Sequence, residues 1–229
     1  MRPVEKGTVP RHYRKYGEAK DDLIGRIGDY CSYCERQIET HLAVEHVQPK
    51  SKEEKLRLAW SNFLLGCVNC NSCKKDKAVI LHQYLWPDTD NTFRAFDYLE
   101  GGLVIAHSAL STELKQKAIA TINLVGLDRD PGNPDKAKRP TKADKRWKRR
   151  QEAWELAKRE RQRLQRKDTS ELRETIVDVA TGRGMFSIWM KVFEDDPDMR
   201  CRLIAGFKGT AQNCFDTDGK PIPRPKGQL

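Results

Sequence analysis

Apolar positions in the second half of the chain recur at helical spacing. Between Ser111 and Gly126 they follow one another at intervals of four, four and three residues, so that one face of a helix is apolar. The Ser111 hydroxyl is placed to cap the first turn of this helix. Residues 142–166 carry only a narrow apolar stripe in a cationic sequence, which predicts a long exposed helix. The stripe consists of Trp147, Trp154, Ala157 and Leu164.

Shorter patterns predict two further helices and two regions of strand. Residues 171–180 and 198–207 are predicted helices, and the second has Asp196 as its cap and Pro197 at its first position. Residues 42–44 are strand-like, and residues 80–106 combine β-forming residues with turn residues, which predicts a hairpin. The protein is therefore predicted to be α+β and mainly helical.

The composition divides the chain into four segments. A polar N-terminal segment precedes a cysteine-rich block, which is followed by a mostly helical region containing the basic helix. The tail has three prolines and two glycines and is expected to be loose. The segments are residues 1–29, 30–80, 81–215 and 216–229.

Charge is concentrated in one part of the chain. The whole protein has a net charge of +10, and Lys136 to Lys167 contain 15 basic and 4 acidic residues. Such a concentration indicates an anionic partner, either nucleic acid or an acidic protein face, although a cationic helix face is also often simply solvated. No apolar run approaches the ~18 residues of a membrane span, and the N-terminus lacks the apolar stretch of a signal peptide. We expect no membrane association and a cytoplasmic location.

Four of the seven cysteines form two C-x-x-C pairs, Cys31 with Cys34 and Cys67 with Cys70, separated by 32 residues. Each pair presents two sulfurs from one turn, and together they supply the tetrahedral four-sulfur set that Zn²⁺ prefers. An odd cysteine count and this spacing fit metal thiolates in a reducing compartment better than disulfides. Cys73, three residues after the second pair, is interpreted as a spare thiol. The sequence predicts a structural zinc site.

Residues between and after the cysteine pairs suggest hydrolytic chemistry. His46 has an ordinary pKa near ~6.5, which suits a base that takes a proton from water. Glu45 and Asn71 offer oxygen ligands, which suit Mg²⁺ or Mn²⁺. Side chains alternate along a strand, so Glu45 and His46 point to opposite faces unless the strand end twists both towards a shared site.

The order of these residues resembles that of the zinc-knuckle HNH, or ββα-metal, endonucleases. The resemblance rests on C-x-x-C, an acid followed by H-x-x-P-K, an asparagine, and C-x-x-C-N-x-x-K. It implies a small ββα-metal core with a four-cysteine zinc site, surrounded by helices from the rest of the chain. It also implies that His46 is the general base, that Glu45 and Asn71 hold the catalytic cation, and that Asn62 braces the loop that orients His46.

Cationic residues are the candidates for contact with nucleic acid. Lys50 follows the proline of the H-x-x-P turn, and Lys74 is the basic residue three positions after Asn71. In the basic helix the candidates are Lys145, Arg146, Arg149 and Arg150. The HNH resemblance further implies DNA cleavage that leaves 5′-phosphate and 3′-hydroxyl ends.

A longer resemblance concerns the HNH nuclease subunit of Septu-type anti-phage defence systems. It rests on YCSYCE, EHVQPKS, the segment from Trp60 through the second cysteine pair, and A-x-x-T-I-N-L-V-G-L-D-R. This likeness implies an ATPase partner of the ABC/SMC type. Nothing in the residues themselves shows an ATPase, since the chain has no G-x-x-x-x-G-K-[ST] phosphate-binding loop. Two alternatives stay open at this stage: a zinc-ribbon nucleic-acid-binding adaptor without catalysis, and an HNH nuclease that cuts RNA.

Overall fold

The computed structural model describes residues 1–229 and confirms the α+β, mainly helical architecture. Seven α-helices accompany two two-stranded antiparallel sheets. The strands are β1 Leu42–His46, β2 Phe63–Cys67, β3 Phe96–Tyr98 and β4 Val104–Ala106. The helices are α1 Ala19–Ile27, α2 Val68–Lys74, α3 Thr112–Val125, α4 Arg146–Arg166, α5 Ser170–Arg183, α6 Phe186–Val192 and α7 Pro197–Gly206.

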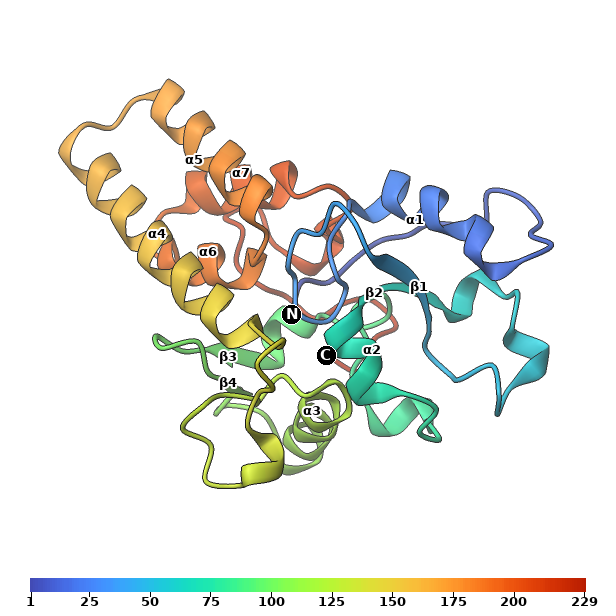
Figure 1. Cartoon of the computed structure of the whole chain (residues 1–229). Coiled ribbons are helices and arrows are strands. Elements are labelled where there is room, and N and C mark those ends of the chain that lie inside the picture. The colour runs from blue at the N-terminus through green and yellow to red at the C-terminus, as the bar shows by residue number, and fades with distance from the viewer.

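Strands β1 and β2 with helix α2 form the predicted ββα unit. Their register pairs Glu45 with Leu64 and His46 with Phe63, so the two faces of the hairpin carry alternate residues. Helix α2 follows β2 directly and packs against both strands, as Figure 1 shows. Helix α1 also contacts the hairpin. The unit thus holds its strands between helices from different parts of the chain.

The capping residues expected from the sequence are confirmed. Ser111 accepts a hydrogen bond from the Leu114 amide at 3.3 Å at the start of α3, and Gly126 ends the helix with φ 64°. Asp196 accepts a bond from the Met199 amide at 3.0 Å and starts α7. The predicted hairpin within residues 80–106 is the β3–β4 pair.

Helix α4 differs from the expected exposed helix. It begins at Arg146, four residues later than predicted, and it packs against α5 and α6. The long pair of helices α4 and α5 is visible at the upper left of Figure 1. Its buried residues include two arginines and a glutamate besides Ala153, Ala157 and Leu164, whereas the two tryptophans of the predicted stripe are only partly buried. One side of α4 therefore packs against the other helices, and its opposite side is exposed to solvent.

Two helices and the tail differ from the sequence prediction. Helix α1 lies in the segment interpreted only as polar, and α6, which contains the buried Trp189, was not predicted. The tail is packed rather than loose, because the Arg224 guanidinium donates to the Val4 and Pro87 carbonyls, each at 3.1 Å. Both ends of the chain accordingly lie near the centre of Figure 1. Proline and glycine content alone did not reveal these long-range contacts.

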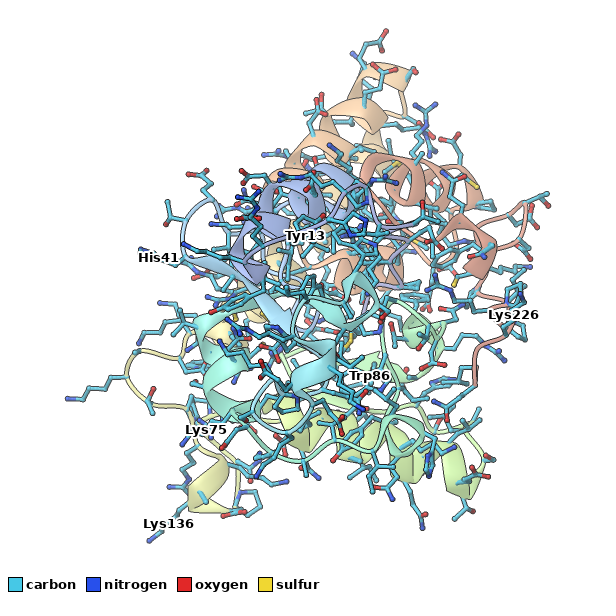
Figure 2. The ribbon with its side chains drawn as sticks, turned by 90° about the vertical axis from the view of Figure 1, so that its right-hand side faces the viewer. Tyr13, His41, Lys75, Trp86, Lys136 and Lys226 are labelled. Atoms are coloured by element: carbon cyan, nitrogen blue, oxygen red, sulfur yellow. The ribbon has the colours of Figure 1, made fainter.

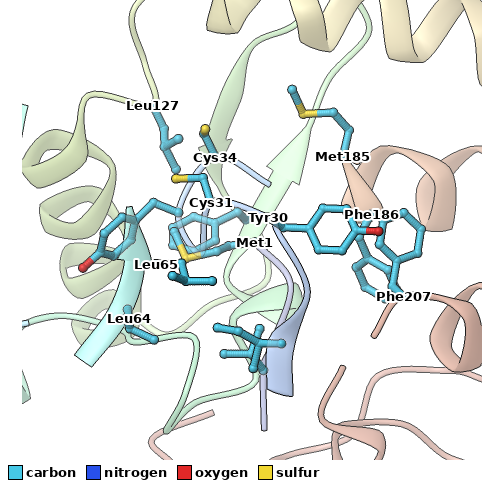
Figure 3. Close-up of a cluster of buried hydrophobic side chains, with 14 of the residues drawn as sticks. Met1, Tyr30, Cys31, Cys34, Leu64, Leu65, Leu127, Met185, Phe186 and Phe207 are labelled. Carbon is cyan, nitrogen blue, oxygen red and sulfur yellow. The ribbon is translucent and has the colours of Figure 1, made fainter. Parts of the chain in front are cut away.

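One apolar core joins the N-terminal segment, the cysteine-rich block and the helices. Figure 3 shows part of it, with Met1 and Tyr30 between Leu65 on one side and Phe186 on the other. In the same view Cys31 and Cys34 lie next to this cluster. The cysteine turn is therefore anchored in the main core of the protein.

The surface is dominated by charged side chains, and Lys75 and Lys136 project from it in Figure 2. Helix α4 is the longest helix, and its sequence is strongly charged. No helix in the structure combines the length and the apolar character that a bilayer crossing requires.

Candidate metal centres and active site

The four paired cysteines lie together, as predicted. The Sγ atoms of Cys31, Cys34, Cys67 and Cys70 are all within 4.8 Å of one another, and all four residues are buried. Cys67 ends strand β2 and caps α2, where its Sγ accepts a hydrogen bond from the Cys70 amide at 3.4 Å. The strand-to-helix junction thus places one sulfur pair opposite the turn that carries the other.

This donor set fits Zn²⁺. Burial raises the pKa of the Cys31 and Cys70 thiols well above the ordinary value, because a thiolate in an apolar surrounding is poorly solvated. Four sulfurs at this separation need a cation before they can all ionise, and Zn²⁺ binding deprotonates cysteine ligands. Cys73 lies outside the four-cysteine group, in agreement with its interpretation as a spare thiol.

Two arginines of α4 are buried, and one of them contacts the cysteine cluster. Arg146 Nη1 lies 3.2 Å from Cys70 Sγ, and the same guanidinium pairs with Asp144 at 2.8 Å. Arg150 donates to the carbonyls of Gly102 and Leu127. Both arginines are 1% exposed, so the structure corrects their assignment to nucleic-acid binding. The two guanidinium groups instead bond to Asp144 and to backbone carbonyls of neighbouring segments, which attaches helix α4 to the rest of the protein.

The expected ligands of the catalytic cation lie on one face of the ββα unit. Glu45 comes from β1 and Asn71 from α2, and both lie above Gly66 of β2. A Cβ atom at Gly66 would collide with Asn71 Oδ1 and would lie 3.0 Å from the Glu45 Cβ. A glycine inside a strand often marks such a close approach, and this signal was overlooked in the sequence.

Asn71 Oδ1 is buried and has no hydrogen-bond partner in the structure. Burying an unpaired amide oxygen is costly, and orphaned groups of this kind point to an absent ion or water. Burial also raises the pKa of the neighbouring Glu45 carboxyl. Because an unpaired amide oxygen and a carboxylate residue lie on the same face of the unit, the residues fit a hard divalent cation that keeps further positions for water or phosphate.

Lys74 does not lie on the surface, as its predicted phosphate contact required. Its side chain is 1% exposed, and its Nζ pairs with Glu45 Oε1 at 2.8 Å and donates to the His46 carbonyl at 2.7 Å. The ammonium counteracts the effect of burial on the pKa of Glu45. Lys74 is thus a buried counterion of the candidate cation ligand, because α2 turns it towards the strands.

His46 lies at the end of β1, where its partner in the register is Phe63 of β2. It packs edge-on against Tyr16 and Phe63, with ring centroids 4.9 Å and 5.2 Å away. Its Nε2 lies 3.0 Å from the Arg57 carbonyl. Since a carbonyl oxygen only accepts, Nε2 carries the hydrogen and Nδ1 keeps its lone pair.

The surroundings of His46 keep it neutral. Burial lowers its pKa, the hydrogen bond to Arg57 acts in the opposite direction, and the Lys50 and Lys74 charges lower the pKa further. A neutral imidazole with a free Nδ1 is the form that can accept a proton. The contacts of Tyr16 and of the Arg57 carbonyl with His46 could not be predicted from the sequence, because both residues are distant from His46 along the chain and approach it only in the folded protein.

Asn62 fastens the loop after His46. Its Nδ2 donates to the Gln48 carbonyl at 2.9 Å and to the Leu56 carbonyl at 3.3 Å, while its Oδ1 accepts from the Gln48 amide at 2.7 Å. The Asn62 carbonyl also accepts from the Val47 amide. These are the loop-bracing bonds that the sequence interpretation attributes to this side chain.

The remaining cationic candidates lie on the surface. Lys50 is exposed, and its ammonium sits 4.1 Å from the centre of the Tyr16 ring that packs on His46. Lys145 and Arg149 are exposed at the start of α4, where Arg149 pairs with Glu152. Of the residues predicted to contact nucleic acid, only these three are exposed to solvent.

Residues 31–77 match the family model of HNH endonucleases. The match contains both cysteine pairs, the β1–β2 hairpin, and α2, and it covers about a fifth of the chain. We call it the HNH domain. It supports nuclease activity, and a four-cysteine cluster is part of it. A search of curated proteins found no match to the chain.

Proposed function

We propose that the protein is a metal-dependent HNH endonuclease that hydrolyses DNA phosphodiester bonds. The observation that carries the proposal is the buried, unpartnered Asn71 oxygen beside Glu45 and Gly66, inside the segment that matches HNH endonucleases. A zinc-ribbon adaptor needs the four cysteines but has no use for two converging oxygen ligands. The arrangement therefore favours an enzyme over a binding module.

The proposed roles follow from the contacts of each residue. His46 Nδ1 takes a proton from water, whose oxygen then bonds to phosphorus, while the bond to the 3′ oxygen breaks and that oxygen takes a proton from solvent water to become a hydroxyl. A divalent cation held by Glu45 and Asn71 supplies charge neutralisation at the phosphate. Asn62 holds the loop, and Arg57 holds the ring through Nε2. The products are a 5′-phosphate and a 3′-hydroxyl.

The test compares wild-type protein with His46→Ala in a plasmid-nicking assay with Mg²⁺ or Mn²⁺. The substitution should reduce cleavage by about 10²-fold or more, since a positioned base contributes on that order. His12→Ala is the matched control, because His12 is exposed and outside the HNH domain. Zinc content and the thermal midpoint should remain near wild type in both. Equal cleavage by His46→Ala and wild type would refute the assignment of His46 as the general base. Cleavage of RNA but not of DNA would show that the substrate is RNA.

We further propose that the chain is the nuclease effector of a Septu-type defence complex in the cytoplasm, with an ATPase partner of the ABC/SMC type. The support is the sequence resemblance outside the HNH motif, which includes the segment of α3. Co-purification from the native operon tests this part. An ATPase that co-purifies supports it, and a chain recovered alone, fully active and non-toxic, contradicts it.

A further inference from the structure

A cleft of about 600 Å³ lies between the turn after Cys34 and helices α4 and α5. Four arginines from three separate segments line it, together with two glutamates. They are Arg36, Arg149, Arg159, Arg183, Glu152 and Glu155. We call this feature the arginine cleft.

The walls of the arginine cleft are fixed by contacts within the chain. Arg36 forms a β-bridge with Gly184 at the end of α5, and the Met185 amide donates to the Glu35 carbonyl at 2.8 Å. Helices α4 and α5 pack against each other. Because all three segments are tied together, the cleft exists before any ligand arrives.

The charges in the cleft favour an anion. Arg149 pairs with Glu152 at 2.7 Å, whereas Arg159 and Arg183 are exposed and form no ion pair within the chain. The lining has a net charge of +2 at neutral pH. Guanidinium groups suit phosphate because their planar donors can engage two oxygens at once.

The spacing of the arginines suits a chain of phosphates better than a single one. Arg149 and Arg159 are ten residues apart on α4, or about 15 Å along the helix axis. This length corresponds to about four base-pair steps at ~3.4 Å each along one DNA strand. A single inorganic phosphate cannot reach both ends.

The cleft begins at the HNH domain. Arg36 Nη2 bonds to Asn69 Oδ1 at 3.0 Å, and Asn69 lies on α2, two residues before the cation ligand Asn71. The whole of α2 is seven residues, about 10 Å long. A nucleic-acid strand in the cleft therefore meets the side of α2 that carries Asn69, and Asn71 points to the other side of the same short helix.

We propose that the arginine cleft binds the sugar–phosphate backbone of the nucleic-acid substrate beside the cleaved segment. The proposal rests on the proposed nuclease function, and it moves the basic binding surface from Arg146 and Arg150 to Arg159, Arg183 and their neighbours.

The test measures binding of the zinc-loaded full chain to a short fluorescein-labelled DNA duplex over a series of salt concentrations, without added Mg²⁺ or Mn²⁺. The double substitution Arg159→Gln, Arg183→Gln should weaken binding about tenfold, since it removes two phosphate contacts, and should flatten the slope of log K against log salt by about two. Both side chains are exposed, so the fold should be unaffected.

Two matched variants sharpen the test. Arg161→Gln removes the same charge from the same helix, but Arg161 pairs with Asp195 outside the cleft, so affinity should stay within about twofold of wild type. Glu155→Gln removes a carboxylate that faces the cleft, and it should tighten DNA binding. Opposite effects of substitutions on one helix exclude a general loss of structure.

Unchanged affinity and salt slope in the double variant would overturn the inference, and continued plasmid cleavage in that variant would leave the proposed function intact. If the double variant loses binding of a poly-glutamate peptide but keeps that of DNA, the cleft receives an acidic protein and the inference is again wrong. Conversely, a wild-type chain that binds DNA through these arginines but cuts no nucleic acid would refute only the nuclease proposal.

Discussion

The HNH domain and the region of helices α4–α7 are stabilised in different ways. The HNH domain consists of two five-residue strands and a seven-residue helix, held by four cysteines and a buried Lys74–Glu45 pair. Helices α4–α7 instead enclose large apolar side chains, among them Phe186, Trp189 and Phe193, which are no more than 1% exposed. The first region carries a four-cysteine cluster that fits zinc and a buried charge pair, and the second is held by apolar packing.

The junction between the two regions combines both principles. Arg146 begins α4 in the helical region, yet its guanidinium reaches Cys70 of the HNH domain and the carbonyl of Val125. Asp144 neutralises it at the same place. The cysteine cluster and the start of the basic helix are therefore in direct contact through Arg146.

The largest effect is expected for Cys70→Ser. Structural zinc contributes on the order of 10–16 kcal/mol in small zinc peptides, as much as the whole stability of many domains. Zinc content should fall to near zero, and limited proteolysis should cut residues 31–77 before helices α5–α7. Cys201→Ser is the control, since Cys201 lies outside the cluster. A Cys70→Ser protein that keeps one tightly bound zinc would show that the ligands are assigned wrongly.

The next largest effect is expected for Arg146→Met. Removing one partner of a buried charge pair leaves Asp144 uncompensated, which costs about 3–5 kcal/mol of unfolding free energy. Arg149→Met, three residues later on the exposed face, should change stability by no more than about 0.5 kcal/mol. Urea denaturation of the two variants measures the difference. Equal midpoints would mean that the junction does not depend on this arginine.

A smaller loss of stability, with a large loss of cleavage, is expected for Gly66→Ala. The added methyl group displaces the Asn71 side chain, at a cost of about 1–3 kcal/mol for overpacking. Zinc should remain bound, because the cysteines are not touched. Differential scanning calorimetry and the nicking assay together check this prediction. Retained cleavage at wild-type rates would show that the Asn71 position is unimportant.

The smallest effect is expected for Gly182→Ala in α5, where an added Cβ meets nothing within 4 Å. Alanine should stabilise the helix by about 0.5–1 kcal/mol relative to glycine, the opposite sign to Gly66→Ala. A destabilised Gly182→Ala protein would indicate an unseen contact at this helix face.

The sequence revealed the parts of the molecule that depend on local chemistry. The two C-x-x-C pairs predicted the cysteine cluster, Ser111 and Asp196 predicted their helix starts, and the hairpin in residues 80–106 was found. Each of these signals lies within a few residues of the structure that it specifies. The bracing bonds of Asn62 belong to the same group, because they close a loop of fifteen residues.

The rest of the molecule depends on contacts between distant segments. Lys74, Arg146 and Arg150 look like surface cations in a basic sequence, and only the packing of α2 and α4 buries them. The loose tail was predicted from composition, but Arg224 anchors it to residues more than 100 positions away. Helix α6 was missed because a helix that is buried almost all round has no polar face to reveal its period.

The central claim is that the HNH domain holds a catalytic cation separate from the structural zinc. The most direct measurement is the nicking rate of zinc-loaded protein as Mn²⁺ is increased, for wild type and Asn71→Ala, with Asn69→Ala as the control on the same helix. Wild type and Asn69→Ala should saturate at low Mn²⁺, and Asn71→Ala should need much more Mn²⁺ to cleave, with zinc content equal in all three. Identical Mn²⁺ dependence in wild type and Asn71→Ala would contradict the claim.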